Sequence, residues 1–268
     1  MQNPPKIFGT EHIIYIVLSF AVTIAILTVV GIFCKTEKLK KIVIKTGGGI
    51  LLFLILLNRV FCIQHWTDVT YLPTSICGTI SLFFGAALIL CKKDSSVLHF
   101  LTYTALFTGL LPTIYPDYLG QGPTIFFPAT ITSLLHHSVC FMMAIMVLEL
   151  KYITPNIKKW YAWPLGYCVL VFYGLFNIKI LNQTDSININ SPILPNTPLN
   201  FFYMGLMFFA LYIIFLFIYD SVVNKKDCVL AKCYRKIVSL FKKKKELDEN
   251  GVVEISKKII LDKKFYNK

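Results

Sequence analysis

HIIYIVLSFAVTIAILTVVGIFCKTEKLKK, residues 12–41, sets a pattern that the rest of the chain repeats. It contains an apolar run, Ile13–Phe33. The run is followed at once by a group of lysines: Lys35, Lys38, Lys40 and Lys41. An apolar helix of about 20 residues crosses the hydrocarbon core of a bilayer, and lysines collect on the cytoplasmic side of such helices. The stretch therefore predicts a membrane-spanning helix whose carboxyl end faces the cytoplasm.

Six further apolar runs follow the first one. Their predicted bounds, good to about three residues, are Ile42–Cys62, Leu72–Leu90, Val97–Tyr115, Ile125–Leu150, Tyr161–Leu181 and Leu199–Tyr219. The run over 42–62 is the weakest, because it contains Gly47–Gly49 near one end and Asn58 and Arg59 near the other. It still counts as a span, since glycine is common in membrane helices and a long basic side chain can snorkel. The sequence therefore predicts an all-α fold, a polytopic transmembrane bundle of about seven helices.

The connections between the predicted spans alternate in charge. Lysines follow the first, third and fifth spans, and a larger basic cluster follows the seventh. The remaining connections carry Asp68, Asp117 and Asp185 instead. Strict alternation of basic and non-basic loops is what the positive-inside rule requires of seven real spans. It predicts an amino terminus outside the cell and a carboxyl terminus in the cytoplasm.

The composition supports a membrane protein and excludes a nucleic-acid-binding one. Of the 268 residues, 56% are hydrophobic and 15% are charged, whereas about a quarter are charged in soluble domains. The net charge of +13 lies in short loops and in the tail, where it suits an anionic inner leaflet. Arg59 and Arg235 are the only arginines, and Ile, Asn and Phe are abundant, as is typical of a low-GC bacterium. We therefore expect a multi-pass protein of a bacterial plasma membrane.

The chain divides into a transmembrane domain, residues 1–220, and a basic cytoplasmic tail, residues 221–268. Apolar residues recur in the tail at roughly helical spacing: Val229, Leu230, Cys233, Ile237 and Leu240. This spacing among cations favours a short helix on the inner leaflet that binds anionic lipid. The alternative is a solvated tail that helps to fix the topology. The oligomeric state is left open.

The eight cysteines are spread singly along the chain and indicate no metal site. Cys62 and Cys77 lie near the outer ends of their spans, so a disulfide between them is geometrically possible. Elsewhere free thiols are the default. The chain has no zinc-type CxxC pair, and Gly47–Gly49 lacks the Lys–Ser/Thr pair of a phosphate loop. We therefore expect neither a metal nor a cofactor.

Polar side chains gather in the outer halves of the predicted spans. The members of this group that we assign to a site are His12, Asn58, Arg59, Gln64, Cys77, His136 and His137. Such a residue at depth costs about 2–3 kcal/mol on insertion scales, so it usually faces the bundle interior. Several at one level indicate a polar cavity that opens outward. The alternative, that helix ends are simply wet, explains His12 well, Arg59 less well and the histidine pair least.

Cys77 and His137 are the pair of residues that could act as a nucleophile and its base. A thiol is nucleophilic as its thiolate, and a nearby histidine can take its proton and later return one to a leaving group. With Pro73 in the first turn of the third span, Cys77 lies about 6 Å deep. With Pro128 at the start of the fifth, His137 lies about 13 Å deep. The reach of the side chains and the stagger of the helices cover part of this difference in depth. The alternative to a Cys–His site is that both residues only pack in apolar helices.

Several segments resemble the YwaF-like family of bacterial integral membrane proteins. They are FGTEHIIYI at 8–16, LPTSIC at Leu72–Cys77, LLPTIYPD at Leu110–Asp117, the buried His137 of the fifth span, and LPNTPLNFFYMG at 194–205. The resemblance covers most of the chain up to the tail. The segment NIKILNQTDSININ, residues 177–190, departs from the family's pattern.

The resemblance implies an activity, because that family is distantly similar to an animal acyltransferase that makes ether phospholipids and to androgen-induced hydrolases of fatty-acid esters. It implies a nucleophile on one helix and a histidine on another, here Cys77 and His137, with His136 an alternative base. We expect an acyltransferase or lipid ester hydrolase whose substrate is a membrane lipid. Substrate contacts are expected from Arg59, with Asn58, Gln64, His12 and His136. The alternative is a non-enzymatic small-solute transporter or membrane scaffold.

Overall fold

The computed structural model describes residues 5–66, 70–116, 119, 122–193, 196–224 and 239. Over these residues the chain is all-helical. The helices are α1 (Thr10–Phe33), α2 (Glu37–His65), α3 (Ile76–Leu90), α4 (Ser96–Ile114), α5 (Pro128–Glu149), α6 (Ala162–Lys179) and α7 (Phe201–Asn224), with a short 3-10 helix, η2 (Ile157–Lys159), before α6. Each predicted span coincides with one α-helix, so the prediction of a seven-helix all-α protein is confirmed.

Six of these helices are long and apolar enough to cross a membrane, and α3, with 15 residues, is a shorter apolar helix. The chain is therefore a multi-pass membrane protein. Helix α7 continues to Asn224, four residues past the predicted end of the transmembrane domain at 220. Beyond the end of α7, the basic tail, with its expected surface helix and its two cysteines, lies outside the described residues except for Ser239.

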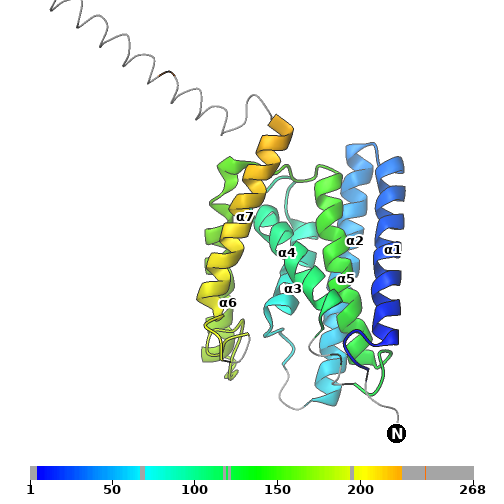
Figure 1. Cartoon of the computed structure of the whole chain (residues 1–268), viewed down its shortest axis with the longest axis vertical. Helices are drawn as coiled ribbons and strands as arrows, with labels where there is room; N and C mark the ends of the chain where they lie inside the picture. The colour runs from blue at the N-terminus through cyan, green and yellow to red at the C-terminus, as the bar shows by residue number, and fades with distance from the viewer. Residues whose placement is uncertain are drawn as a thin grey trace, which may run out of the picture. The chain divides into compact units, whose positions relative to one another are not determined.

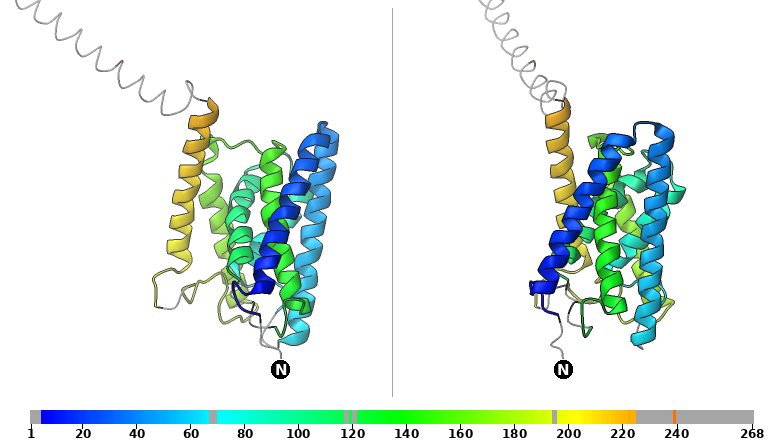
Figure 2. Two further views of the ribbon diagram at one scale, coloured as in Figure 1. Left: turned by 45° about the vertical axis from the view of Figure 1, so that its right-hand side comes forward. Right: turned by 90° about the vertical axis from the view of Figure 1, so that its right-hand side faces the viewer.

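Consecutive helices from α1 to α6 run antiparallel (Figures 1 and 2). The α1–α2, α3–α4 and α5–α6 connections therefore lie at one end, which we call the basic end because it carries the lysine-rich loops. The α2–α3 and α4–α5 connections and the segment after α6 lie at the opposite end. The charge alternation thus separates the two ends of the bundle, and the assignment of the basic end to the cytoplasm stays a prediction.

Helices α4 and α5 form the centre of the bundle, and α1 lies at its edge. More than half of the most apolar window of α4 and of α5 is buried, whereas α1 buries only His12 and Thr23. Apolar side chains of α1 point outward, with Val17 62%, Ile24 63% and Phe33 69% exposed. Such an apolar surface is suited to contact with lipid tails, because the hydrocarbon core of a bilayer contains no water.

The glycine run that made the second span look weak is where α2 and α3 approach each other closely. A Cβ atom at Gly48 would lie 2.7 Å from Leu88 Cβ and 3.0 Å from the Gly85 carbonyl oxygen. A Cβ at Gly85 would in turn lie 3.1 Å from the backbone nitrogen of Leu52. Small residues at a membrane helix crossing let the backbones pack directly against each other. Helix α2 is continuous through the run because this packing offsets the low helix propensity of glycine.

We expect Gly48→Ala to lower the thermal stability of the protein and Gly49→Ala to leave it unchanged or raised. The methyl group at 48 meets backbone and a Cβ atom, and such overpacking costs about 1–3 kcal/mol. At Gly49 a Cβ meets nothing within 4 Å, so the substitution gains helix propensity of about 1 kcal/mol. Thermal unfolding of the two variants in detergent measures the difference. Equal midpoints would contradict a close crossing at Gly48.

Candidate functional site

An open cavity of about 870 Å³ lies among α2, α3 and α5. Five of the seven predicted site residues line it: Asn58, Arg59, Cys77, His136 and His137. Other lining residues that bear on its chemistry are Cys62, Pro73, Thr74, Ser75, Ser133, Asp185, Ser186 and Ile187. The cavity therefore combines two thiols, two imidazoles and a guanidinium group that come from three helices.

Cys77 is the second residue of α3, and Ser75 fixes where that helix begins. The Ser75 side chain caps the helix by accepting a hydrogen bond from the Gly78 N–H at 3.1 Å. Thr79 donates its hydroxyl to the carbonyls of Ser75 and Pro73, at 2.8 and 3.2 Å. The prediction that Pro73 lies in the first turn is wrong, because the helix starts at Ile76 and Pro73 precedes the cap.

The amino end of α3 supplies a favourable environment for negative charge beside the thiol. The first turn of any helix presents backbone N–H groups without intrahelical partners, and the helix dipole is positive there. Cys77 therefore lies where a thiolate, or the oxyanion of a tetrahedral intermediate, is stabilised. This feature follows from the corrected start of α3 and was absent from the predicted geometry.

The two histidines lie at the middle of α5, both buried. Pro128 is at the first position of this helix, as predicted, so His137 lies nine residues along it. Nδ1 of His136 is 3.2 Å from the Ser81 hydroxyl of α3, which orients this ring. The two imidazole centroids are 4.0 Å apart, with their planes 44° from each other. The pair thus presents two neighbouring imidazoles to one cavity.

Asn58 joins α2 to α5 at the cavity wall. Its amide donates to the Ala129 carbonyl at 2.9 Å and to the Thr132 hydroxyl at 3.1 Å. Its Oδ1 lies 3.7 Å from the Cys62 sulfur. Because both amide protons are used within the protein, Asn58 positions the wall, and it is less suited than Arg59 to donate to a ligand.

Arg59 is half-buried and lines the same cavity. Its Nε and Nη2 atoms donate to the Thr70 carbonyl, at 3.1 and 2.5 Å. A guanidinium group has five N–H donors in a fixed fork, so this carbonyl occupies one edge of the group. Within the described part of the chain no carboxylate forms an ion pair with it. Arg59 is therefore held in place with positive charge available for a phosphate or an oxyanion.

The segment after α6 covers part of the cavity, a role the sequence did not predict. Its backbone is tied to the segment before α3, because the Ile187 N–H donates to the Thr74 carbonyl at 2.7 Å. Tyr173 of α6 donates its hydroxyl to the Pro73 carbonyl at 2.7 Å. Ile187 has a φ of 50°, which is rare for a β-branched residue. This strained position is held by burial, since Ile187 is 1% exposed and packs where a Cβ on Gly174 would lie.

Asp185 brings a carboxylate to the same covering segment. Burial raises its pKa, but hydrogen bonds from the Asn190 N–H and from Ser191 outweigh this and lower the pKa below its usual value. It is therefore ionised at neutral pH, and its oxygens are engaged within the segment. A dense run of Asn, Asp and Ser was the available sequence signal, since these residues favour tight turns.

His12 and Gln64 are not among the described residues that line the cavity. His12 is buried elsewhere: Nδ1 accepts the Phe8 N–H at 3.1 Å, so Nε2 carries the proton and donates to the Thr113 carbonyl at 3.2 Å. It therefore joins α1 to the end of α4. Gln64 lies in the last turn of α2 and is exposed. The structure thus does not bring these two predicted substrate contacts to the cavity.

The cysteines near the cavity form no disulfide. Cys62 and Cys77, between which a disulfide seemed possible, are both unbridged. Cys168 of α6 is also free and is exposed, outside the residues that line the cavity. The Cys77 sulfur is therefore not held in a disulfide.

A model of the TMEM164 family, a family of membrane proteins, matches residues 7–219. The match includes every helix from α1 to α6 and all the residues that line the cavity. No curated protein and no solved structure gives a significant match to the chain.

Proposed function

Because this chain belongs to the TMEM164 family of membrane proteins, we propose that its cavity is the active site of a lipid-active acyl transfer enzyme. The observation that carries the proposal is the presence of Cys77, His136, His137 and Arg59 on the wall of one open cavity. Cys77 is the nucleophile and His137 is the base. The resemblance of the chain to YwaF-like proteins adds support, since it implies the same two residues.

The first half-reaction is acyl transfer from a membrane lipid to sulfur. His137 takes the thiol proton of Cys77, and the thiolate attacks the carbonyl carbon of the lipid ester. The oxyanion that forms is stabilised by backbone N–H groups at the start of α3. The carbon–oxygen bond to the lipid alcohol then breaks, and the imidazolium returns its proton to the departing alkoxide. The products are a lipid alcohol and a Cys77 thioester.

The second half-reaction regenerates the thiol. His137 takes a proton from an acceptor hydroxyl, which attacks the thioester carbonyl. The carbon–sulfur bond breaks, and the Cys77 thiolate recovers its proton from the imidazolium. Water as acceptor gives a fatty acid, and a second lipid alcohol gives a new ester, so the acceptor decides between a hydrolase and an acyltransferase.

Arg59 is assigned to the lipid phosphate. A phosphate accepts from the planar fork of a guanidinium in a paired geometry that lysine cannot reproduce. The Thr70 carbonyl holds one edge of Arg59 and leaves the group facing the cavity. The phosphate would thus lie toward the end of α2, while the ester lies near Cys77.

Lipid profiling of membranes that carry the protein tests the proposal. Wild type is compared with Cys77→Ala and His137→Ala, each expressed to the same level. We expect both variants to lose the lipid changes that the wild type produces, since each removes a group that bonds to or exchanges protons with the reacting atoms. Cys168→Ala is the matched control and should behave as wild type, because Cys168 is exposed and does not line the cavity. Identical profiles for all four proteins would remove acyl transfer and favour a non-enzymatic transporter or scaffold.

A further inference from the structure

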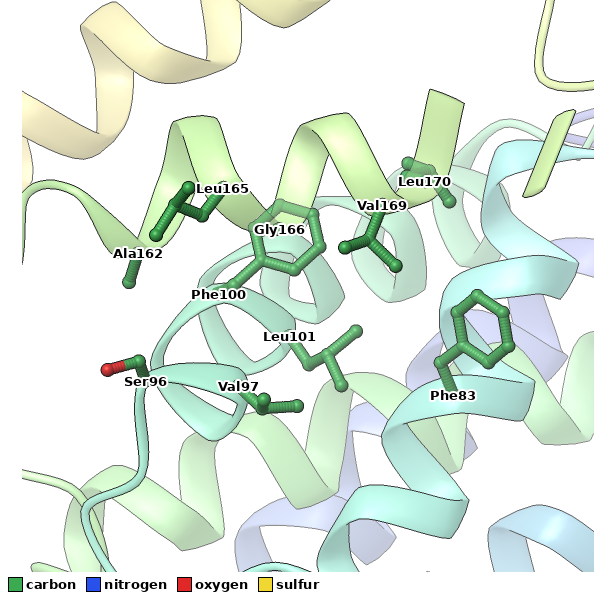
Figure 3. Close-up of a pocket in the computed structure, with 10 residues that line it drawn as sticks. All are labelled: Phe83, Ser96, Val97, Phe100, Leu101, Ala162, Leu165, Gly166, Val169 and Leu170. Atoms are coloured by element: carbon green, nitrogen blue, oxygen red, sulfur yellow. The ribbon is translucent and has the colours of Figure 1, made fainter. Parts of the chain in front are cut away.

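A second cavity, of about 410 Å³, lies between α4 and α6 and is separate from the residues assigned to acyl transfer. Figure 3 shows Ser96 and Ala162 at one end of it, and Phe83 and Leu170 at the other. Ten residues line it, and all are apolar or glycine except Ser96. We call it the α4–α6 groove.

The groove opens sideways to the surface that faces lipid. Val97 of α4 is 52% exposed, and Leu165 and Val169 of α6 are each 62% exposed. Its floor depends on Gly166, because a Cβ there would lie 2.2 Å from the Phe100 ring. The ring fills the place of the missing side chain, and the lining of the groove extends past it from Ser96 and Ala162 to Phe83 and Leu170. This shape suits a single acyl chain.

An apolar lining alone cannot select a ligand inside a bilayer. Lipid tails are as apolar as the groove, so an acyl chain gains little hydrophobic free energy by entering it. Selection must therefore come from a headgroup that is bound at one end. The end formed by Ser96 and Ala162 is at the basic end of the bundle, next to the α3–α4 and α5–α6 connections.

Two exposed lysines at this end carry positive charge that no ion pair among the described residues neutralises. Lys92 lies four residues before Ser96 and Lys158 four residues before Ala162, and both are exposed. The two connections adjoin, since the Ser96 and Tyr161 hydroxyls are 3.3 Å apart. Among the described residues neither Lys92 nor Lys158 forms an ion pair.

The nearby acidic groups are already engaged by other cations. Lys93 pairs with Glu37 at 2.6 Å, and Lys159 pairs with Asp94 at 2.7 Å. Burial raises the pKa of Asp94, but hydrogen bonds from Lys159 and His99 lower it overall, so it stays ionised and neutralised. The excess charge at the end of the groove is therefore positive.

We propose that the α4–α6 groove binds one acyl chain of an anionic phospholipid, whose phosphate contacts Lys92 and Lys158. Trp160 and Tyr161, 51% and 40% exposed, lie beside these lysines, as aromatic residues do at the level of lipid headgroups. The site would bind a lipid of the leaflet at the basic end. It is thus distinct from the acyl transfer cavity, whose covering segment lies at the opposite end.

Native mass spectrometry of the full chain in detergent tests the site, with dioleoyl phosphatidylglycerol and dioleoyl phosphatidylcholine as probes. The two lipids have the same chains and differ in headgroup charge. We expect one phosphatidylglycerol to remain bound at concentrations where phosphatidylcholine dissociates. Lys92→Gln with Lys158→Gln should weaken phosphatidylglycerol binding about tenfold and leave phosphatidylcholine binding unchanged.

A matched double variant separates this site from general charge attraction. Lys38→Gln with Lys41→Gln removes the same charge from exposed positions of α2 and should leave binding unchanged. Val97→Trp fills the groove from an exposed position of α4, and Leu165→Trp fills it from α6. Each should weaken phosphatidylglycerol binding with no change in thermal stability.

Three results would overturn the proposal. Equal retention of the two lipids would exclude headgroup selection. An equal loss in the Lys38/Lys41 variant would assign the attraction to overall charge. Unchanged binding in both tryptophan variants would place the lipid outside the groove.

Discussion

Cys77→Ala is expected to abolish formation of an acyl-enzyme and to lower lipid turnover by a factor of about 10³ or more. Among the described residues that line the cavity, Cys62 is the other thiol, but its sulfur lies 3.7 Å from the Asn58 amide oxygen and it is far along α2 from the start of that helix. Among the described cysteines, Cys77 is the one that lies both on the cavity wall and at the amino end of a helix. The loss should therefore be close to complete.

Acid quenching of the purified protein shortly after mixing with a phospholipid ester, followed by intact mass measurement, checks this expectation. Wild type and Cys168→Ala should each carry one acyl group, and neutral hydroxylamine should remove it, as it does from a thioester. Cys77→Ala should carry none. An adduct that persists in Cys77→Ala, or one that peptide mapping places on Cys62, would assign the nucleophile elsewhere.

The helices were predictable because their apolar runs are long, and their ends were predictable only where the cap was recognised. Helix α2 begins at Glu37 and not at Ile42, since Thr36 caps it and accepts the Leu39 N–H at 3.3 Å. Hydropathy detects only the part of a helix that lies among lipid tails, so the polar first turns were missed. At α3 the predicted start is too early, because Ser75 is the cap and Pro73 precedes the helix.

The depth of a residue in its span identified most of the cavity but not which way each side chain points. Asn58 and Arg59 were predicted to share a site with Cys77, and all three line the cavity. Gln64 lies five residues after Arg59, which is about 140° around a helix, and it is exposed. His12 lies in the first turn of α1, at the edge of the bundle. Distances along a helix are readable from sequence, whereas the packing partner of each face is not.

The covering segment after α6 was the part least accessible to prediction. It has no periodicity, and its position depends on backbone hydrogen bonds such as that from Ile187 to Thr74. Such contacts join residues more than one hundred positions apart and leave no local pattern. Residues 177–190 depart from the YwaF-like pattern, so the resemblance also gives no indication that this segment supplies Asp185, Ser186 and Ile187 to the cavity.

His137→Ala is expected to lower lipid turnover by about 10²–10⁴-fold, the usual contribution of a general base. The choice of His137 over His136 follows from the resemblance to YwaF-like proteins and from the contact that holds the His136 ring. Nδ1 of His136 is engaged by the Ser81 hydroxyl at 3.2 Å, which fixes this ring as part of the α3–α5 contact. His137 is also a lining residue, and its ring is hydrogen-bonded to the Thr108 backbone.

Ser81→Ala separates the two histidines without removing either ring. If His137 is the base, Ser81→Ala should keep turnover within about tenfold of wild type, because the group it releases does not exchange protons with substrate. If His136 is the base, loss of its orienting hydroxyl should lower turnover nearly as much as His136→Ala does. The measurement is kcat/KM for phospholipid ester turnover, with thermal unfolding to show that each variant is folded. A large loss in Ser81→Ala together with an active His137→Ala would move the base by one position, about 100° around α5, and leave Cys77 as the nucleophile.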